Sequence, residues 1–433
     1  MDSHNKNGLN VCARFLPQAV RQFSQLPATP VTVSASCDGA LAEPFPYANL
    51  LVLVLCQIGM HSCLTGMRMA APLQLLQRDV DVWAVGVVMA MFATAPVLLA
   101  LTAGRMADRH GYHRPTRIAA SLSCAGAVLA SSTDHYLLLC LAAALCGGGS
   151  SFGLIALQRT AARLARNAGE RMKVFGWIAI APALASLVGP LGAGLLIDQY
   201  GFRIAFAALA MLPLGTLLLS LWVPRERMAE PVSREQRRPA WDLLREPAFR
   251  RLLFINWLVS ASWDVHSFAL PILGNARGMS ASAIGAILGA YAVTSTLVRL
   301  LLIPLLANRL RQRSIILGAL LLTAAVYAVY PWLGPAWAMA LGTATLGVAL
   351  GTIQPALMTQ LHHVTPSSRH GEGLAVRSVF INFSGASMPL LFGVLGAALG
   401  AASLFWLMSG VLLAGSWQAR RLGAAGGLAA RET

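Results

Sequence analysis

Residues 82–114 read VWAVGVVMAMFATAPVLLALTAGRMADRHGYHR, an apolar run over 82–104 followed at once by a cluster of basic residues. A helix of about 20 apolar residues crosses the ~30 Å hydrocarbon core of a bilayer, and basic side chains stay at its surface. Lipid offers no partner to an unpaired backbone group, so a crossing segment must be helical. This stretch therefore predicts a transmembrane helix and the cytoplasmic loop that follows it.

The same alternation of apolar runs and short polar breaks fills the chain from Asn49 onward. Of 433 residues, 56% are hydrophobic and only 12% are charged, against roughly 25% charged in soluble proteins. The composition predicts an all-α integral membrane protein of about 12 transmembrane helices. The expected spans are 48–72, 82–104, 115–132, 136–160, 174–197, 203–222, 252–274, 281–304, 314–332, 336–359, 375–397 and 400–418.

The basic residues predict the orientation. With the N-terminus in the cytoplasm, the outer loops hold only Arg78, Arg203 and Arg277, and the cytoplasmic side carries most of the others. This bias favours an even number of spans with both termini cytoplasmic, in a bacterial inner (plasma) membrane. The net charge of +16 lies in short clusters between apolar runs, which argues against nucleic acid and leaves the lipid bilayer as the partner.

The chain divides into five segments. We expect a cytoplasmic tail over 1–47, a six-helix bundle over 48–222, a cytoplasmic linker over 223–251, a second six-helix bundle over 252–418 and a tail over 419–433. The linker is charged and rich in proline, as a connection between two units would be. Within it, residues 241–251 are a candidate amphipathic helix on the membrane surface.

Two internal matches indicate that the bundles are repeats. The segment GRMADRHG at 104–111 corresponds to PLLANRLR at 304–311, and GPLGAG at 189–194 corresponds to MPLLFG at 388–393, an offset of 199. Both matches fall at the same place in a six-helix period. Halves related in this way can rock against each other and open a central site to each side in turn.

The segment GRMADRHGYHR at 104–114 resembles motif A of the major facilitator superfamily, which joins the second and third helices. The residues that fit the motif are Gly104, Asp108, Arg109, Gly111 and Arg114. Tyr112 and His113 stand where basic residues are usual. The resemblance covers roughly residues 48–418 and implies two bundles around a central cavity. It also implies a gating latch at Asp108 and Arg109, for which a plain stop-transfer charge cluster is the alternative.

The fifth span resembles motif C of the antiporters in this superfamily. The positions that match in spacing are Gly176, Gly189, Pro190 and Gly194. Ala185 and Ala193 replace two of the usual glycines. Small residues permit tight helix packing and proline bends the helix. The resemblance implies the drug/proton antiporter-like branch and efflux rather than uptake, although generic small-residue packing explains the same pattern.

Asp264 is the one acidic residue well inside an expected span. Charges within a membrane are costly and usually face a cavity, so this carboxylate is the first candidate for proton coupling. A structural hydrogen bond or an ion pair with an arginine is the alternative. His266 and His61, which also lie in spans, are further candidates for proton coupling, although each is more often a packed side chain than a relay.

Other polar and aromatic side chains within the spans are candidates for the substrate cavity. They are Arg68, Arg299, Arg377, Gln57, Asn256, Trp263, Tyr291, Gln354 and Asn382. Arg68 and Arg299 either neutralise Asp264 or bind an anionic group, and one acid cannot satisfy both. This excess of cations favours an anionic or zwitterionic solute.

The motifs that are missing narrow the function. The sequence has no Walker-type phosphate loop, no His-Glu-x-x-His or paired-cysteine metal site and no Gly-x-Ser-x-Gly elbow. These absences leave an ion gradient or the solute gradient itself as the energy source. We expect a secondary transporter driven by the proton gradient, which is a monomer, is not an enzyme and binds no cofactor. The leading interpretation is export of a small organic molecule by alternating access. The alternative is an importer or facilitator of an organic anion.

Overall fold

The computed structural model describes residues 47–164, 168–223, 240–302, 312–366 and 369–420. The two expected tails and most of the expected linker therefore lie outside the described residues. The surroundings of a few residues within helices are also not described, among them Gly104, Asp108 and Gly176. The following concerns the described residues of the unit that spans 46–433.

The described residues form twelve long α-helices and no strand. The helices are α1 (Tyr47–Leu76), α2 (Val82–His110), α3 (His113–Ser132), α4 (Tyr136–Leu164), α5 (Ala168–Tyr200), α6 (Phe202–Leu219), α7 (Pro247–Ala276), α8 (Ala281–Leu297), α10 (Gln312–Val329), α11 (Ala336–Val364), α12 (His370–Leu399) and α13 (Ala401–Arg420). Each expected span falls on one of them, which confirms the predicted fold class. Nine spans in the described residues are long and apolar enough to cross a membrane on composition alone.

Four short elements adjoin the long helices. Three are 3₁₀ turns, η1 (Ser220–Trp222), η2 (Ala240–Arg245) and η4 (Tyr330–Trp332), and η3 (Val298–Leu302) is a π-helical turn at the end of α8. The amphipathic helix expected over 241–251 is wrong, because η2 ends at Arg245 and α7 begins at Pro247. Glu246 is extended, as proline disfavours a helical residue before it.

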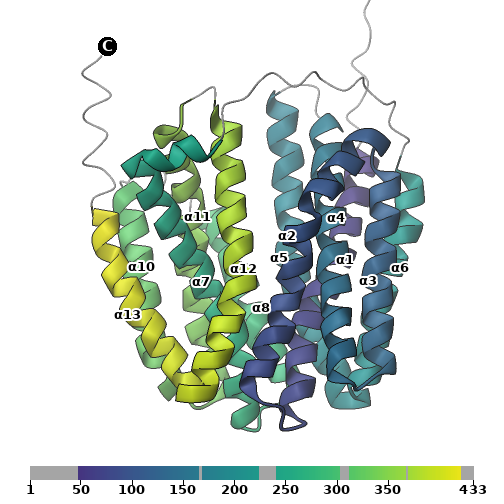
Figure 1. Ribbon diagram of the computed structural model, residues 1–433, viewed down its shortest axis with the longest axis vertical. Coiled ribbons are helices and arrows are strands. Elements are labelled where there is room, and N and C mark those ends of the chain that lie inside the picture. Colours follow the sequence, from purple (N-terminus) through teal and green to yellow (C-terminus); the bar gives the residue numbers. More distant parts are fainter. Residues whose placement is uncertain (1–46, 165–167, 224–239, 303–311, 367–368, 421–433) are drawn as a thin grey trace, which may run out of the picture. The chain divides into compact units, whose positions relative to one another are not determined.

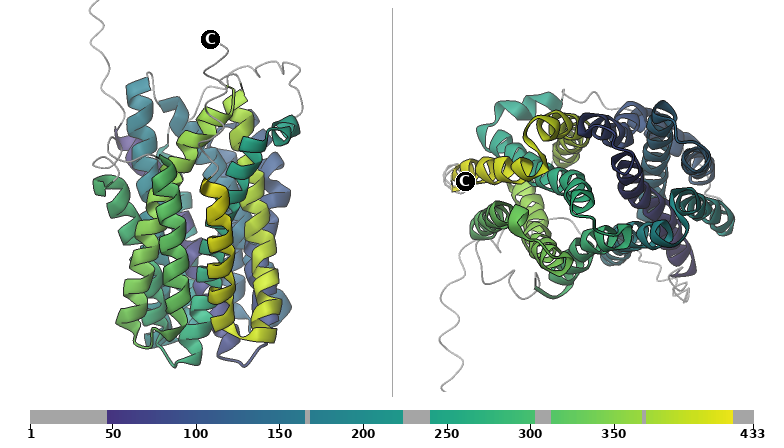
Figure 2. Two further views of the ribbon diagram at one scale, coloured as in Figure 1. Left: turned by 90° about the vertical axis from the view of Figure 1, so that its left-hand side faces the viewer. Right: turned by 90° about the horizontal axis from the view of Figure 1, so that it is seen from below.

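Helices α1–α6 form one bundle and α7–α13 a second (Figures 1 and 2). We call the end at which α1 begins the near end, which is uppermost in Figure 1, and the opposite end the far end. The main contacts between the bundles are α5 on α8 and α2 on α12. In Figure 1, α2 and α12 lie close together at the far end and diverge toward the near end.

Glycines allow the far ends of the bundles to meet backbone to backbone. A Cβ at Gly285 of α8 would strike the carbonyl of Pro190 in α5, and a Cβ at Gly194 would strike that of Ala281. On the other side, a Cβ at Gly86 of α2 would strike α12. Small residues at such crossings bring helices close enough for extensive van der Waals contact.

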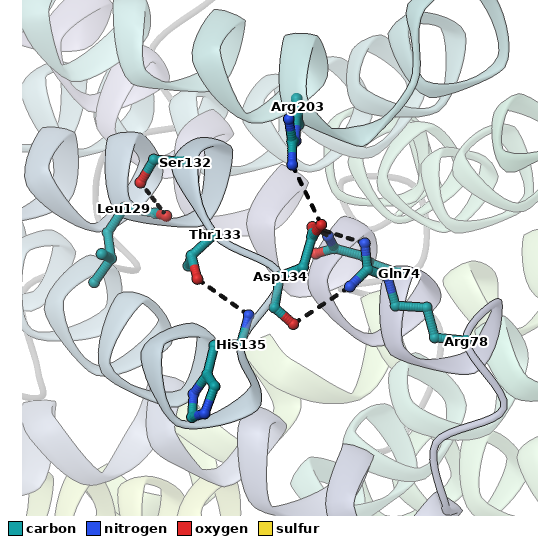
Figure 3. A network of polar contacts seen from close by, with 8 residues as sticks. All are labelled: Gln74, Arg78, Leu129, Ser132, Thr133, Asp134, His135 and Arg203. Carbon is teal, nitrogen blue, oxygen red and sulfur yellow. Dashed lines mark hydrogen bonds and ion pairs between the residues drawn. The ribbon is translucent and has the colours of Figure 1, made fainter.

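Asp134 ties the far-end loops of the first bundle together (Figure 3). Its carboxylate lies 2.7 Å from the Arg78 guanidinium and 3.4 Å from that of Arg203, and it accepts a hydrogen bond from Gln74 at 3.0 Å. In the second bundle, Arg277 donates to the carbonyls of Leu333 and Pro331. The three basic residues predicted for this side are therefore engaged in local contacts.

Candidate functional site

A cavity of about 610 Å³ lies between the two bundles, halfway along the helices. Its lining comes from α1, α2, α4 and α5 of the first bundle and from α7, α8 with η3, α11 and α12 of the second. Helices α3, α6, α10 and α13 supply none of the described lining residues. The site is therefore shared equally between the bundles and changes shape whenever one moves against the other.

The described lining of the first bundle carries a cation and no acid. Arg68 and His61 lie one above the other on α1 and both line the cavity. The Nη2 atom of Arg68 is buried and has no hydrogen-bond partner among the described residues. Three serines line the same cavity from the first bundle, Ser150 and Ser151 on α4 and Ser186 on α5.

Asp264 supplies the acid on the opposite wall. It lies midway along α7, is 7% exposed and lines the cavity. Its Oδ2 accepts a hydrogen bond of 3.1 Å from the Ser384 hydroxyl of α12. Among the described residues, no ion pair within 4.0 Å joins Asp264 to a cation. The carboxylate is thus held by a neutral donor and faces the cavity.

Aromatic rings and a second arginine complete the second bundle's wall. Trp263 packs on Tyr291 with ring centroids 4.2 Å apart, and both line the cavity. Arg299 also lines it, from the π-helical turn η3, and its side chain is exposed. Such turns widen a helix locally and are frequent at functional sites. Gln354 and Asn382 add amide groups to the lining.

Four of the expected site residues lie away from the cavity lining. Arg377 donates to Asn256 Oδ1 and to Gln354 Oε1, both at 2.9 Å, and so touches the cavity only through Gln354. Gln57 is buried within the first bundle. His266 is buried among Tyr330 and Phe405, with its Nε2 3.2 Å from the Thr343 hydroxyl.

The motif residues lie at helix ends and helix crossings. Gly111 ends α2 with φ of +66°, a left-handed conformation that favours glycine, and Arg109 and Arg114 are exposed beside it. The departure at Tyr112 is a buried ring, 2% exposed. Gly189 packs on α1, whereas Pro190 and Gly194 pack on α8. The surroundings of Gly104, Asp108 and Gly176 lie outside what the structure describes.

Sequence reasoning missed two polar contacts that the fold creates. One is Ser384, the partner of Asp264. The other is Asp198 at the far end of α5, whose carboxylate oxygens accept the backbone N–H groups of Ala281 and Ser282, both at 2.9 Å. An acid at a helix N-terminus is favourable, and this one joins the two bundles. Neither partner is near in sequence, so no local signal identifies the pair.

Comparison with known sequences identifies a family. The sequence model described as Major Facilitator Superfamily matches residues 53–262 and 252–423. Among curated proteins, the chain is 27% identical over 240 residues to the multidrug resistance protein MdtG of Citrobacter koseri and 26% identical to that of Salmonella arizonae. Each alignment covers 53% of this chain and 58% of the relative, so the chain spans little more than half the length of the curated relatives it matches.

Solved structures share the fold. A peptide transporter POT in complex with sulfate superposes with a TM-score of 0.74 and 12% sequence identity, over 88% of this chain and 95% of that one. The nucleoside transporter NupG gives a TM-score of 0.70 at 12% identity, over 87% of this chain and 100% of the other. At this level of identity the likeness concerns the arrangement of helices alone.

Proposed function

The chain belongs to the major facilitator superfamily, and from this we propose that it is a secondary transporter that exports a small organic molecule, coupled to protons, by alternating access. The cavity carries the proposal. It is shared by four helices of each bundle and lies midway along them. The far end is packed through glycines, so in this conformation the site is closed at the far end and a solute reaches it from the near end. We take the near end as cytoplasmic, with both termini on that side of an inner membrane.

Two observations support export over uptake. The curated relatives are named multidrug resistance proteins, and Gly189, Pro190 and Gly194 make the crossings that a motif C would make. Gly189 fits α5 against α1, while Pro190 and Gly194 fit it against α8. A helix packed on both bundles seals the far end while a molecule enters from the near end.

Asp264 is the proposed site of proton coupling. It faces the cavity, accepts one hydrogen bond from a neutral hydroxyl and has no cation within 4.0 Å among the described residues. Burial disfavours the charged form of a carboxyl group. A proton can therefore bind when the cavity is open to the acidic side and leave when it is open to the other. His61, on the facing wall, is within the same cavity.

Uptake or facilitated passage of an organic anion is the second candidate. Arg68 and Arg299 both line the cavity, and Asp264 is the one acid in its described lining. A cavity with more cations than anions attracts negatively charged solutes. Under either candidate the chain works as a monomer with no bound cofactor.

Inverted membrane vesicles separate the candidates. With export, a proton gradient that is acid inside drives uptake of the substrate into such vesicles, and collapsing the gradient stops it. We expect Asp264→Asn to reduce gradient-driven uptake at least tenfold while the protein still folds and still exchanges substrate across the membrane. Asp79→Asn is the matched control, because Asp79 is exposed in the loop after α1 with φ of +58°, which asparagine adopts readily. Normal gradient-driven rates in Asp264→Asn would remove the carboxylate from coupling.

A further inference from the structure

A smaller chamber of about 160 Å³ adjoins the main cavity on its far-end side. The two spaces share His61, Leu64, Arg68, Ser186 and Trp263. The residues found only in the chamber are displaced toward the far end along their helices, and they are Thr65, Met69, Met89, Pro190, Ser267 and Leu288. Pro190 is also the residue against which Gly285 packs. The chamber is therefore the far-end limit of the cavity and lies directly next to the contact that closes the far end.

Arg68 stands at the boundary between the two spaces. It lines both of them, and its buried Nη2 has no hydrogen-bond partner among the described residues. A buried guanidinium nitrogen without a hydrogen-bond partner is unfavourable, and an anion placed with good geometry offsets that cost. A guanidinium presents paired N–H groups that match a carboxylate, sulfonate or phosphate.

Among the described residues, no acid forms an ion pair with Arg68, and Asp264 attracts it only through a longer-range charge interaction across the cavity. Asp264 is the sole acid in the described lining of the two spaces, and its Oδ2 is engaged by Ser384. Neither of its oxygens lies within 4.0 Å of a described cation. With Arg299 in the same lining, the cations outnumber the anions whether Asp264 is ionised or protonated. The free partner position at Arg68 is thus open to an anion from outside the protein.

The chamber beyond Arg68 is suited to an apolar group. Met69, Met89, Pro190 and Leu288 provide an apolar wall, and methionine adapts to ligands of different shape. For scale, an apolar protein cavity of about 150 Å³ holds one benzene-sized ring. The chamber of about 160 Å³ therefore has room for a single ring or a short chain.

We propose that the substrate is a small amphiphilic organic anion whose charged head pairs with Arg68 and whose apolar part fills the methionine-lined chamber. The proposal rests on the proposed transport function and adds the chemical class of the solute. Substrate held in this way lies against Pro190, so it touches the helix pair that must separate for release at the far end.

Three probes with one ring and different charge test the head group. They are benzenesulfonate, a permanent anion, benzenesulfonamide, its neutral analogue, and phenyltrimethylammonium, a permanent cation. Calorimetry on the purified full-length protein in detergent should show benzenesulfonate binding at least tenfold more tightly than either of the others. Equal binding of all three, or tighter binding of the cation, would overturn the proposal.

Two variants assign the head and the ring to their places. Arg68→Gln should abolish the preference for the anion. Arg68→Lys should keep part of it, because lysine retains the positive charge but lacks the paired N–H groups of the guanidinium. Met89→Trp should fill the chamber and weaken benzenesulfonate at least tenfold while leaving methanesulfonate, which has no ring, unchanged. The control is Arg78→Gln, far from the cavity and paired to Asp134, which should bind all probes as the parent does.

The outcomes also separate this proposal from the transport function. If Arg68→Gln does not fold, the charge series on the parent and the two sulfonates on Met89→Trp still decide the matter. Tight, Arg68-dependent binding without gradient-driven movement in vesicles would support the site and reject coupled transport. Gradient-driven movement of the ammonium probe with no binding of the sulfonate would support transport and reject the anion site.

Discussion

The two bundles meet at the far end through two contacts, and in both a glycine of one helix packs on the backbone carbonyl of a proline in the other. Between α5 and α8, Gly285 faces the carbonyl of Pro190, and between α2 and α12, Gly86 faces the carbonyl of Pro389. Both glycines and both prolines are separated by 199 residues, the offset of the internal repeat. The two contacts are therefore the same glycine-to-proline crossing, made once by each half on the other.

The contacts differ in their polar chemistry. Asp198 of α5 accepts two backbone N–H groups at the start of α8. The position 199 residues later is Ala397 of α12, whose side chain has no acceptor to offer to α2. Close packing is therefore common to both contacts of the closed far end, whereas the Asp198 carboxylate stabilises only the contact between α5 and α8.

Overpacking either crossing should have the largest effect on how often the far end is closed, and therefore on transport. Gly285→Leu and Gly86→Leu each place a side chain where the facing backbone lies, and overpacking costs about 1–3 kcal/mol. Because this cost applies only when the far end is closed, we expect the closed form to lose roughly 5- to 150-fold in population. Transport should fall accordingly, and the two variants should behave alike.

Accessibility of the chamber provides the measurement. The reporter is Ser267→Cys in a background whose seven native cysteines are replaced. This cysteine should react faster with a membrane-impermeant maleimide added on the far side when Gly285→Leu or Gly86→Leu is also present than when it is not. Gly192→Leu is the control on α5, because nothing lies within 4 Å of a Cβ at that position. Labelling that speeds up in Gly285→Leu but not in Gly86→Leu would show that the two crossings are not equivalent.

The sequence predicts the scaffold far better than the pairings. Apolar runs bounded by arginines specify each helix because lipid leaves no other conformation, and the repeat predicted that 189–194 and 388–393 occupy equivalent places. Which glycine meets which proline depends on how two bundles dock, and no local pattern records it. Gln57 and Arg377 show the same limit for the cavity, since both were expected in its lining and neither lies there.

Asp264 and Arg68 were found from sequence because a charge within an apolar run is conspicuous whatever the fold. Asp198 was missed because an acid at the end of an expected span looks like an ordinary loop residue. The small chamber was missed for another reason. Methionines such as Met69 and Met89 are typical of any membrane helix, and only the docking of α1, α2 and α8 makes them a wall.

Removing the carboxylate from one contact should have an intermediate effect. Asp198→Ala deletes two hydrogen bonds to the α8 N-terminus, and an anion at an exposed helix N-terminus contributes about 0.3–1 kcal/mol. We expect the maleimide reaction at Ser267→Cys to speed up roughly two- to fivefold, with Asp198→Asn between this variant and the parent. The neighbouring Gln199→Ala, which is exposed, should leave the rate unchanged. A rate at the parent's level in Asp198→Ala would mean that glycine packing alone closes both contacts.

The smallest effect is expected from removing the Asp134 carboxylate, whose ion pairs lie within the first bundle and not between the bundles. Hydrogen bonding from the Arg78 guanidinium, together with its charge and that of Arg203, holds the pKa of Asp134 below its ordinary value. A carboxyl group with a lowered pKa stabilises the fold at neutral pH, and that contribution is lost as the pH falls through the folded-state pKa. Asp134→Asn should therefore lower the melting temperature by only about 1–2 °C at pH 7, because exposed ion pairs contribute little, and the difference should disappear once the pH is below the lowered folded-state pKa of Asp134.

A double-mutant cycle sharpens the point. If the carboxylate acts through Arg78, then adding Arg78→Gln to Asp134→Asn should cost little more than either change alone. Transport should stay at the parent's rate in all three variants, because Arg78, Asp134 and Arg203 join loops of one bundle and touch neither far-end crossing. A transport defect in Asp134→Asn would mean that the first bundle does not move as a rigid body. It would also mean that the ion pairs of Asp134 within the first bundle change during transport, as the glycine crossings between the bundles do.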